Sequence, residues 1–403
     1  MGAYFLSGAA ALVYQVLWTR RLGNVFGVTV QAASTVLACF MAGLAIGSWW
    51  VGRRADRDRN PLRVFALVEC LIGVAALLTP FALTGVEGIF VRLSSVDSPA
   101  LGQLLLRAGL SSLVLIVPST LMGATYPLIL RATARTESGL RTSASLLYGV
   151  NTLGAVAGVL TSAFWLIPML GMRATFLVAA ATNGLVAILA LAASRTWAAS
   201  SAAGGAASEP SSSGETVSVT PAGRRAVLVV MAVSGGVSLA LEIVWFRVLV
   251  FFLRPTTYAF ASMLAAVLVG IAAGSLLVTL WMKRRARGLA TLAGLELLIG
   301  LLGLWSAPAI VKSYDVMDWV WSLKLPAPFD YIAALMVPAA FAILPTALLL
   351  GAAFPLGVVL WTSGQTGADV GRRVGTLYSL NVAGAIVGSL ASGFLLVPRI
   401  GAQ

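Results

Sequence analysis

Long runs of apolar residues alternate with short polar segments along the whole chain. Most runs contain about 20 residues, the length that a helix needs to cross a hydrocarbon core of roughly 30 Å. The runs are continuous and do not alternate residue by residue, which argues against a transmembrane barrel. The pattern therefore predicts an all-α polytopic membrane protein with eleven spans, at residues 3–18, 28–51, 62–83, 106–130, 145–170, 174–193, 227–252, 258–282, 289–311, 331–361 and 377–397.

One stretch near the N-terminus recurs past the middle of the chain. Ser7 and Trp18 return as Ser234 and Trp245 at one constant offset, each with the same neighbouring glycine or arginine. Similar matches follow in the same order through both halves, among them Gly43 with Gly270, Gly47 with Gly274, Glu69 with Glu296, Tyr148 with Tyr378, Asn151 with Asn381, Gly154 with Gly384 and Gly158 with Gly388. Composition alone does not produce an ordered series of this kind. The sequence predicts a tandem duplication.

The duplication defines the predicted domains. Residues 1–193 form a six-helix half, residues 194–225 form a flexible linker rich in Ser, Ala and Gly, and residues 226–403 form the second half. An even number of spans per half makes the copies parallel repeats, as in major facilitator transporters. The second half contains five predicted spans, so the repeat predicts a twelfth helix that these 403 residues lack.

Composition agrees with a membrane location and narrows the classes of function. The chain is 59% hydrophobic and only 10% charged, with a mean hydropathy of +0.95. Its net charge of +13 lies mainly in short loops between the spans, which favours a topology signal over nucleic acid binding. The larger share of Lys and Arg falls in one set of alternate loops, which predicts that these loops and the N-terminus are cytoplasmic.

Residue types exclude several kinds of catalytic site. The chain has no His and only two Cys, both within apolar spans, and no nucleophile elbow or phosphate-binding glycine loop follows a predicted strand. We therefore predict no catalytic residue, no metal site and no cofactor within these residues.

Three carboxylates fall inside predicted spans, where a charged group is costly and is a functional candidate by default. Glu69 and Glu296 occupy equivalent positions, whereas Glu242 stands where the first half has Gln15. Such groups could bind a cationic substrate or exchange protons. Alternatively, each could pair with an Arg or cap a helix and so stabilise the fold. Symmetry favours the structural alternative for Glu69 and Glu296, and its absence makes Glu242 the leading functional candidate.

Aromatic and amide side chains complete the candidate substrate site. Aromatic faces bind ammonium cations, and the repeated aromatic residues within spans are Trp18, Trp245, Tyr148 and Tyr378. The same residue types also anchor helices at membrane interfaces. Asn151 and Asn381 each lie one helical turn after the tyrosine of their half, where an amide could bind a ligand or join two helices.

Glycine pairs spaced four residues apart occur twice in each half. They are Gly43 with Gly47, Gly154 with Gly158, Gly270 with Gly274, and Gly384 with Gly388. This spacing lets two helix backbones approach closely, so we predict helix-packing surfaces at all four pairs.

Two resemblances follow from these motifs. The loop at residues 52–59 resembles the major facilitator loop signature in part. The repeated Ser-Gly…Trp-x-Arg openings, the Gly-x-x-x-Gly-Ser helix ends and the two Leu-Tyr-x-x-Asn-x-x-Gly-Ala motifs (residues 147–155 and 377–385) resemble the membrane-bound spermidine synthase-like family. In that family, a major facilitator-like membrane region precedes a soluble aminopropyltransferase domain. The resemblance implies such a domain beyond residue 403, so no catalytic residue is carried over.

Three functional hypotheses remain open at this point, and one of them is an enzyme whose chemistry lies wholly in the implied C-terminal domain. The first is a transporter-like region for polyamines or related cations, which would make the lipid bilayer and a cationic small molecule the partners. The second is a non-transporting membrane anchor or scaffold, either for a C-terminal synthase domain or as one of several partner subunits in a larger complex.

Overall fold

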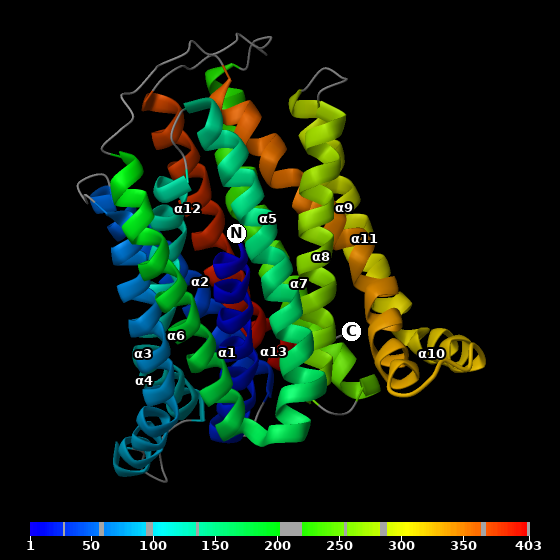
Figure 1. The fold of residues 1–403 in the computed structure, drawn as a ribbon. Coiled ribbons are helices and arrows are strands. Elements are labelled where there is room, and N and C mark those ends of the chain that lie inside the picture. The colour runs from blue at the N-terminus through cyan, green and yellow to red at the C-terminus, as the bar shows by residue number, and fades with distance from the viewer. Residues whose placement is uncertain are drawn as a thin grey trace. The chain divides into compact units, whose positions relative to one another are not determined.

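The computed structural model describes residues 1–26, 29–55, 60–93, 100–133, 137–201, 220–253, 256–282, 288–363 and 368–400. These residues fold into helices joined by short connections (Figure 1). The chain divides into two compact units, Met1–Ser213 and Gly214–Gln403. Each unit is described separately below.

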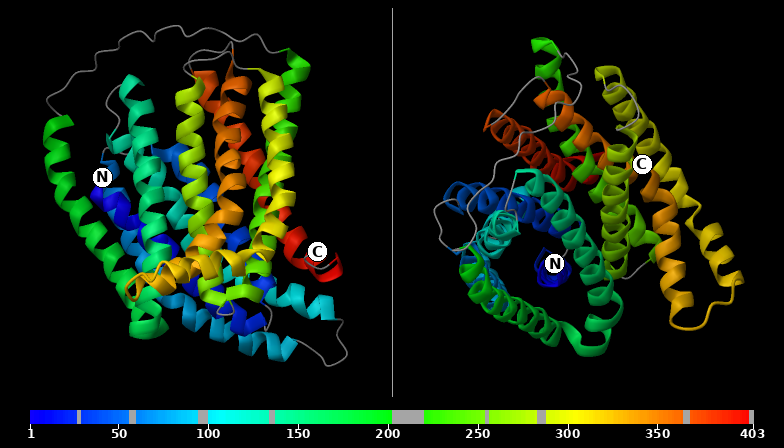
Figure 2. Two further views of the ribbon diagram at one scale, coloured as in Figure 1. Left: turned by 90° about the vertical axis from the view of Figure 1, so that its right-hand side faces the viewer. Right: turned by 45° about the horizontal axis from the view of Figure 1, so that its top comes forward.

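Unit 1 contains six long helices and one π-helical turn, η1. In chain order they are α1 (Gly2–Phe26), α2 (Thr29–Ala55), α3 (Pro61–Leu93), α4 (Ala100–Thr133), α5 (Glu137–Thr161), η1 (Ser162–Leu166) and α6 (Ile167–Ser201). Helix α1 contacts each of the other helices of its unit, and the right view in Figure 2 shows α5 and α6 beside it. Within α6 the backbone turns at Gly171, whose φ of 75° favours glycine. This turn separates the fifth predicted span from the sixth.

Unit 2 repeats this order with one added short helix, α10, and has its own π-helical turn, η2. It contains α7 (Pro221–Leu253), α8 (Thr256–Met282), α9 (Leu289–Val311), α10 (Ser313–Ser322), α11 (Phe329–Thr362), α12 (Ala368–Ala391), η2 (Ser392–Leu396) and α13 (Val397–Ile400). The short helix α10 was not predicted as a helix. It runs across the direction of α9 and α11 (Figure 1) and packs on α11.

The helix content and arrangement confirm the predicted all-α polytopic architecture. Nine stretches of the described residues are helical, long and apolar enough to cross a membrane, and one of them, residues 146–195, contains both the fifth and the sixth predicted spans. The first predicted span is helical as part of α1, but α1 is not among the nine stretches. Helix α1 is largely buried and contacts the other helices of unit 1. It therefore needs fewer apolar side chains to face lipid.

The glycine pairs lie where helices meet. A Cβ added at Gly47 would collide with the Thr120 carbonyl oxygen between α2 and α4, and one at Gly274 would collide with that of Leu348 between α8 and α11. Gly154 and Gly384 lie equally close to the backbones of α1 and α7. The structure thus confirms the predicted packing surfaces, and it assigns two closely packed helix pairs to each unit.

The prediction of a flexible linker at residues 194–225 is wrong at both ends of that range. Helix α6 continues to Ser201 and α7 begins at Pro221, so both ends of that range are helical. The Ser194 carbonyl accepts a hydrogen bond from Asn60, which ties this end of α6 to the start of α3. Residues 202–219 lie outside the described residues, as do residues 56–59 of the predicted loop signature.

Candidate functional site

The carboxylate of Glu69 lies at the centre of a closed hydrogen-bond network in unit 1. It accepts a hydrogen bond from Ser7 Oγ on α1 at 2.5 Å and one from Asn183 Nδ2 on α6 at 2.7 Å. Glu69 itself sits on α3 and is 0% exposed. A buried carboxylate must be hydrogen-bonded or paired to be tolerated. Two donors from two neighbouring helices meet this requirement without a cation.

The network continues along α1 through aromatic side chains. Tyr14 donates to Asn183 Oδ1 at 2.9 Å, and its ring stacks on Trp18 with centroids 5.8 Å apart. The Trp18 indole N–H then donates to Thr79 Oγ1 on α3 at 3.0 Å. Both rings are fully buried. These contacts join α1, α3 and α6 into one polar seam inside an apolar unit.

Unit 2 contains the equivalent of the hydrogen bond between Trp18 and Thr79. The Trp245 indole N–H donates to Ser306 Oγ at 2.8 Å, and Ser306 stands at the position equivalent to Thr79. Trp245 is 1% exposed. Both tryptophans are therefore buried within their units and hydrogen-bonded to a neighbouring helix. This geometry favours a packing role over that of an interface anchor or an open cation-binding face.

Glu296 differs from its counterpart Glu69. Ser234, the equivalent of Ser7, is the neighbouring hydroxyl. However, Glu296 Oε1 is buried without a hydrogen-bond partner among the described residues. The side chain as a whole is only half-buried. The two equivalent carboxylates thus share a serine but not an amide donor.

Glu242 and Gln15 occupy equivalent positions on α7 and α1. Both side chains are buried, with exposed fractions of 6% and 2%. Among the described residues, neither has a hydrogen-bond partner for its side chain, and no cation pairs with any of the three carboxylates. The alternative that each Glu pairs with a nearby Arg is therefore wrong for the described residues. Glu242 is a membrane-embedded carboxylate whose oxygens are free to accept hydrogen bonds from a ligand.

The remaining candidates fall into two groups. Tyr148 and Tyr378 are substantially exposed, at 50% and 39%, and Phe354 packs edge-on against Tyr378. In contrast, Asn381 Nδ2 donates to the Met231 carbonyl at 2.9 Å, which joins α12 to α7. Asn151 lies against Gly8 at the equivalent contact between α5 and α1. The asparagines lie where two helices meet, whereas the tyrosine side chains are partly exposed.

Sequence reasoning missed Tyr14, Asn183 and Thr79 as members of the seam. Asn183 carried a signal, because an amide inside an apolar span usually forms an interhelical hydrogen bond. Thr79 also carried one, since the repeat pairs it with Ser306, another hydroxyl. Tyr14 has Leu241 as its counterpart and gave no such signal.

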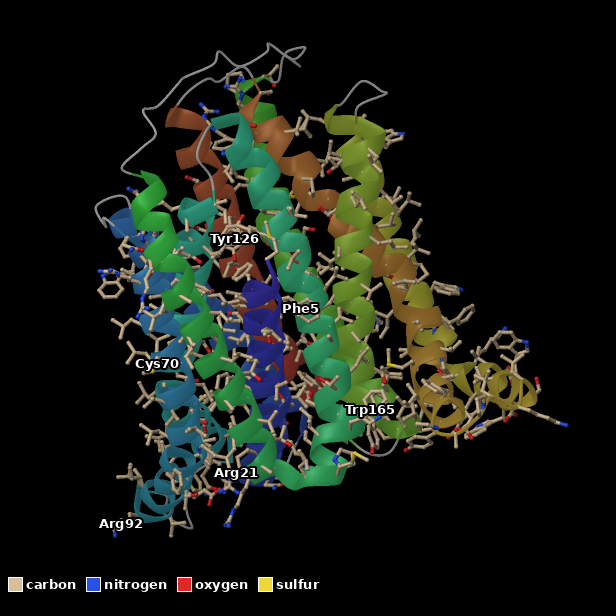
Figure 3. The ribbon with its side chains drawn as sticks, in the orientation of Figure 1. Phe5, Arg21, Cys70, Arg92, Tyr126 and Trp165 are labelled. Carbon is tan, nitrogen blue, oxygen red and sulfur yellow. The ribbon has the colours of Figure 1, made fainter. Side chains whose placement is uncertain are left out.

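The described side chains include groups that can bind a cation. No group of three or more His, Cys, Asp or Glu that could hold a metal ion occurs among the described residues. The labelled side chains in Figure 3 illustrate where ionisable and aromatic groups lie in unit 1, with Arg21 and Arg92 towards one end of its helices. A free carboxylate and exposed aromatic rings are suited to binding a cation.

Comparison with known proteins identifies the fold. No family model and no curated protein matches the chain. Among solved structures, a bacterial homologue of the human lysosomal transporter Spinster, inward-facing and unoccupied, matches with a TM-score of 0.54 and 15% identity over 97% of this chain and 79% of that chain. A D-xylose–proton symporter matches with a TM-score of 0.52 and 14% identity over 100% and 92% of the two chains.

These likenesses show the fold alone, because the identities are low. The chain has the major facilitator fold of a multi-pass membrane protein, as its internal duplication predicted. Its lipid partner follows from this fold. Its substrate does not.

Proposed function

We propose that this chain is a transporter-like membrane region for polyamines or related cations, and that it belongs to a spermidine synthase-like protein of the bacterial inner membrane. One observation carries the transport proposal. Glu242 places a carboxylate that has no partner among the described residues on a membrane-spanning helix of a transporter fold. Leaving such a group in the membrane costs free energy, so its presence there suggests that a ligand or proton occupies it.

The chemistry of the other candidate residues supports a cationic ligand. A polyamine carries several ammonium groups, each of which is stabilised by a carboxylate or an aromatic face. Glu242 is the proposed carboxylate, and Tyr378 of the same unit, whose ring is partly exposed, is the proposed aromatic contact. Glu69 has both of its oxygens occupied by protein donors. We therefore assign Glu69 to the structure of unit 1 and not to the substrate.

The proposed family also suggests an orientation. A cytoplasmic N-terminus, supported by the distribution of Lys and Arg, would place the proposed aminopropyltransferase domain in the cytoplasm. Enzymatic activity would then reside in that domain, and the membrane region would move its substrate or product.

Flux in proteoliposomes tests the transport proposal. Purified protein should transport spermidine or putrescine, and Glu242→Gln should reduce the initial rate at subsaturating substrate about ten- to a hundredfold, as expected for the loss of one charge-assisted contact. Glu87→Gln, a change on α3 away from the repeat candidates, serves as the matched control and should retain the rate. Absence of flux with well-folded protein would refute transport of these polyamines.

A membrane scaffold is the second candidate function, and the tight packing of each unit favours it. Backbone contacts at the glycine pairs and the closed Glu69 network are what a rigid anchor requires. A scaffold predicts that no polyamine is transported and that Glu242→Gln leaves binding of partner subunits intact.

A further inference from the structure

Arginines concentrate at one end of unit 1, formed by the C-terminal ends of α1, α3 and α5 and the N-terminal ends of α2, α4 and α6. Figure 3 shows Arg21 and Arg92 at this end. Lys and Arg are usually concentrated on the cytoplasmic side of a membrane, whereas the predicted topology places this end on the opposite side. Topology therefore does not explain these residues. The described residues here include one carboxylate, Glu87, and five arginines, which are Arg20, Arg21, Arg92, Arg107 and Arg173.

Arg107 has protein partners that account for its position. Its Nη1 donates to the Phe26 carbonyl at the C-terminal end of α1 at 3.5 Å, and its guanidinium carbon lies 4.1 Å from the centre of the Phe90 ring. A cation is favourable at a helix C-terminus, where the last carbonyls lack a donor within the helix. Arg107 therefore joins α4 to α1 and α3, and we assign it a structural role.

Arg21, near the end of α1, is held in place but retains a donor without an acceptor. Its Nη2 donates to Thr84 Oγ1 on α3 at 3.0 Å, and the Thr84 hydroxyl donates in turn to the Pro80 carbonyl at 3.0 Å. The Nε of Arg21 is buried and has no hydrogen-bond partner among the described residues. A buried N–H without an acceptor costs free energy. This edge of the guanidinium is therefore suited to an acceptor from outside the chain.

Unit 2 lacks this pair of polar residues. At the constant offset of the repeat, Arg21 and Thr84 correspond to Val248 and Val311. The nearby hydrogen bond from a tryptophan to a hydroxyl is nevertheless present in both units. The shared packing forms without an arginine or a threonine at these positions, which favours a ligand-binding role for the pair in unit 1.

We propose that Arg21 binds the phosphate group of an anionic phospholipid, with Thr84 as the positioning residue that holds the guanidinium. Guanidinium groups bind phosphate through two parallel N–H···O bonds, and Nε with the adjacent Nη supplies such a pair of donors. The ends of membrane-spanning helices lie among lipid headgroups, which makes a lipid the source of the phosphate. The excess of arginine over carboxylate at this end favours a headgroup with a net negative charge. The proposal does not depend on polyamine transport.

Binding of short-chain lipids to the detergent-purified chain, measured by isothermal titration calorimetry, tests this proposal. The probes are dihexanoylphosphatidylglycerol, which is anionic, and dihexanoylphosphatidylcholine, which is zwitterionic. We expect the anionic lipid to bind more tightly, and Arg21→Gln to weaken its binding about tenfold through loss of a charge-assisted contact. Arg173→Gln removes an exposed positive charge from the same end and is the matched control. A change of less than about twofold is expected there, since exposed charges are screened.

Two further variants separate a specific site from general attraction between charges. Arg21→Lys retains the charge but lacks the forked donors, so we expect about a threefold loss of affinity for the anionic lipid. This variant also keeps the test available if Arg21→Gln does not fold, as judged by circular dichroism. Thr84→Val removes the acceptor that holds Arg21, and it should reduce the preference for the anionic lipid over the zwitterionic one.

Three results would overturn the proposal. Equal weakening by Arg21→Gln and Arg173→Gln would mean that the whole end attracts anions without a site. Equal affinity of the wild-type chain for the two lipids would remove the preference for a negative headgroup. Displacement of the anionic lipid by inorganic phosphate at a similar concentration would refute a lipid as the source of the phosphate.

Discussion

The two units use one packing frame for different polar interiors. The frame is shared: tryptophan bonded to a hydroxyl on the third helix, glycines against backbone carbonyls, and a π-helical turn after the fifth helix. The buried polar groups differ. In unit 1 an amide donates to Glu69, and the position equivalent to Glu242 is Gln15. In unit 2 Glu296 Oε1 has no hydrogen-bond partner among the described residues. We expect features that both copies retain to maintain the fold, and features that differ to carry the function.

The glycine contacts offer the largest test of the shared frame. Gly47→Ala and Gly274→Ala would each place a methyl group against a backbone carbonyl that cannot move aside, between α2 and α4 or between α8 and α11. Overpacking of this kind costs about 3 kcal/mol, and we expect similar losses in both units. Unfolding in mixed detergent micelles measures the loss. Gly85→Ala, where nothing lies within 4 Å, is the control, and equal losses at all three positions would argue against the shared frame.

Removal of the Asn183 amide tests the difference between the buried polar groups of the two units. Asn183→Leu deletes the donor to Glu69 Oε2 and the acceptor for the Tyr14 hydroxyl, so two buried polar atoms each lose a hydrogen bond. We expect the free energy of unfolding to fall by about 2 kcal/mol. Asn183→Gln, which retains an amide, should recover part of this loss. Equal stability of the leucine variant and the wild type would show that the network contributes nothing to folding.

The tryptophan bonds should give the smallest effect and the most symmetrical one. Trp18→Phe and Trp245→Phe each remove one hydrogen bond to a neighbouring helix and retain most of the buried ring. A loss of about 1 kcal/mol in each case follows from one interhelical hydrogen bond. The same unfolding measurement applies. A large loss in one unit only would mean that the two bonds are not equivalent.

Periodicity and repetition predicted the fold well because each depends on local sequence. Apolar runs place the helices, and the matched glycines predicted close packing. Helix α10 escaped prediction, since a ten-residue amphipathic segment with Asp315 and Trp319 resembles an interface loop. The ends of the linker were also misassigned, because Ser and Ala near residue 194 are compatible with a helix that is already propagating.

The candidate site was less predictable. The repeat distinguishes Glu242 from the symmetrical carboxylates, and its functional role stays a prediction. The repeat could not show that Asn183 on a distant span reaches Glu69, because that contact depends on how α3 and α6 pack. Likewise, burial of Trp18 follows from its position between helices and not from its residue type.

The most direct test of the account compares spermidine binding by Glu242→Gln and Glu69→Gln. Isothermal titration with detergent-purified protein measures both, with circular dichroism to confirm folding. If unit 2 carries the ligand-binding carboxylate, Glu242→Gln weakens binding about ten- to a hundredfold and Glu69→Gln leaves it near that of the wild type. Equal weakening by both variants, or unchanged binding in Glu242→Gln, would contradict the division between a structural and a functional carboxylate.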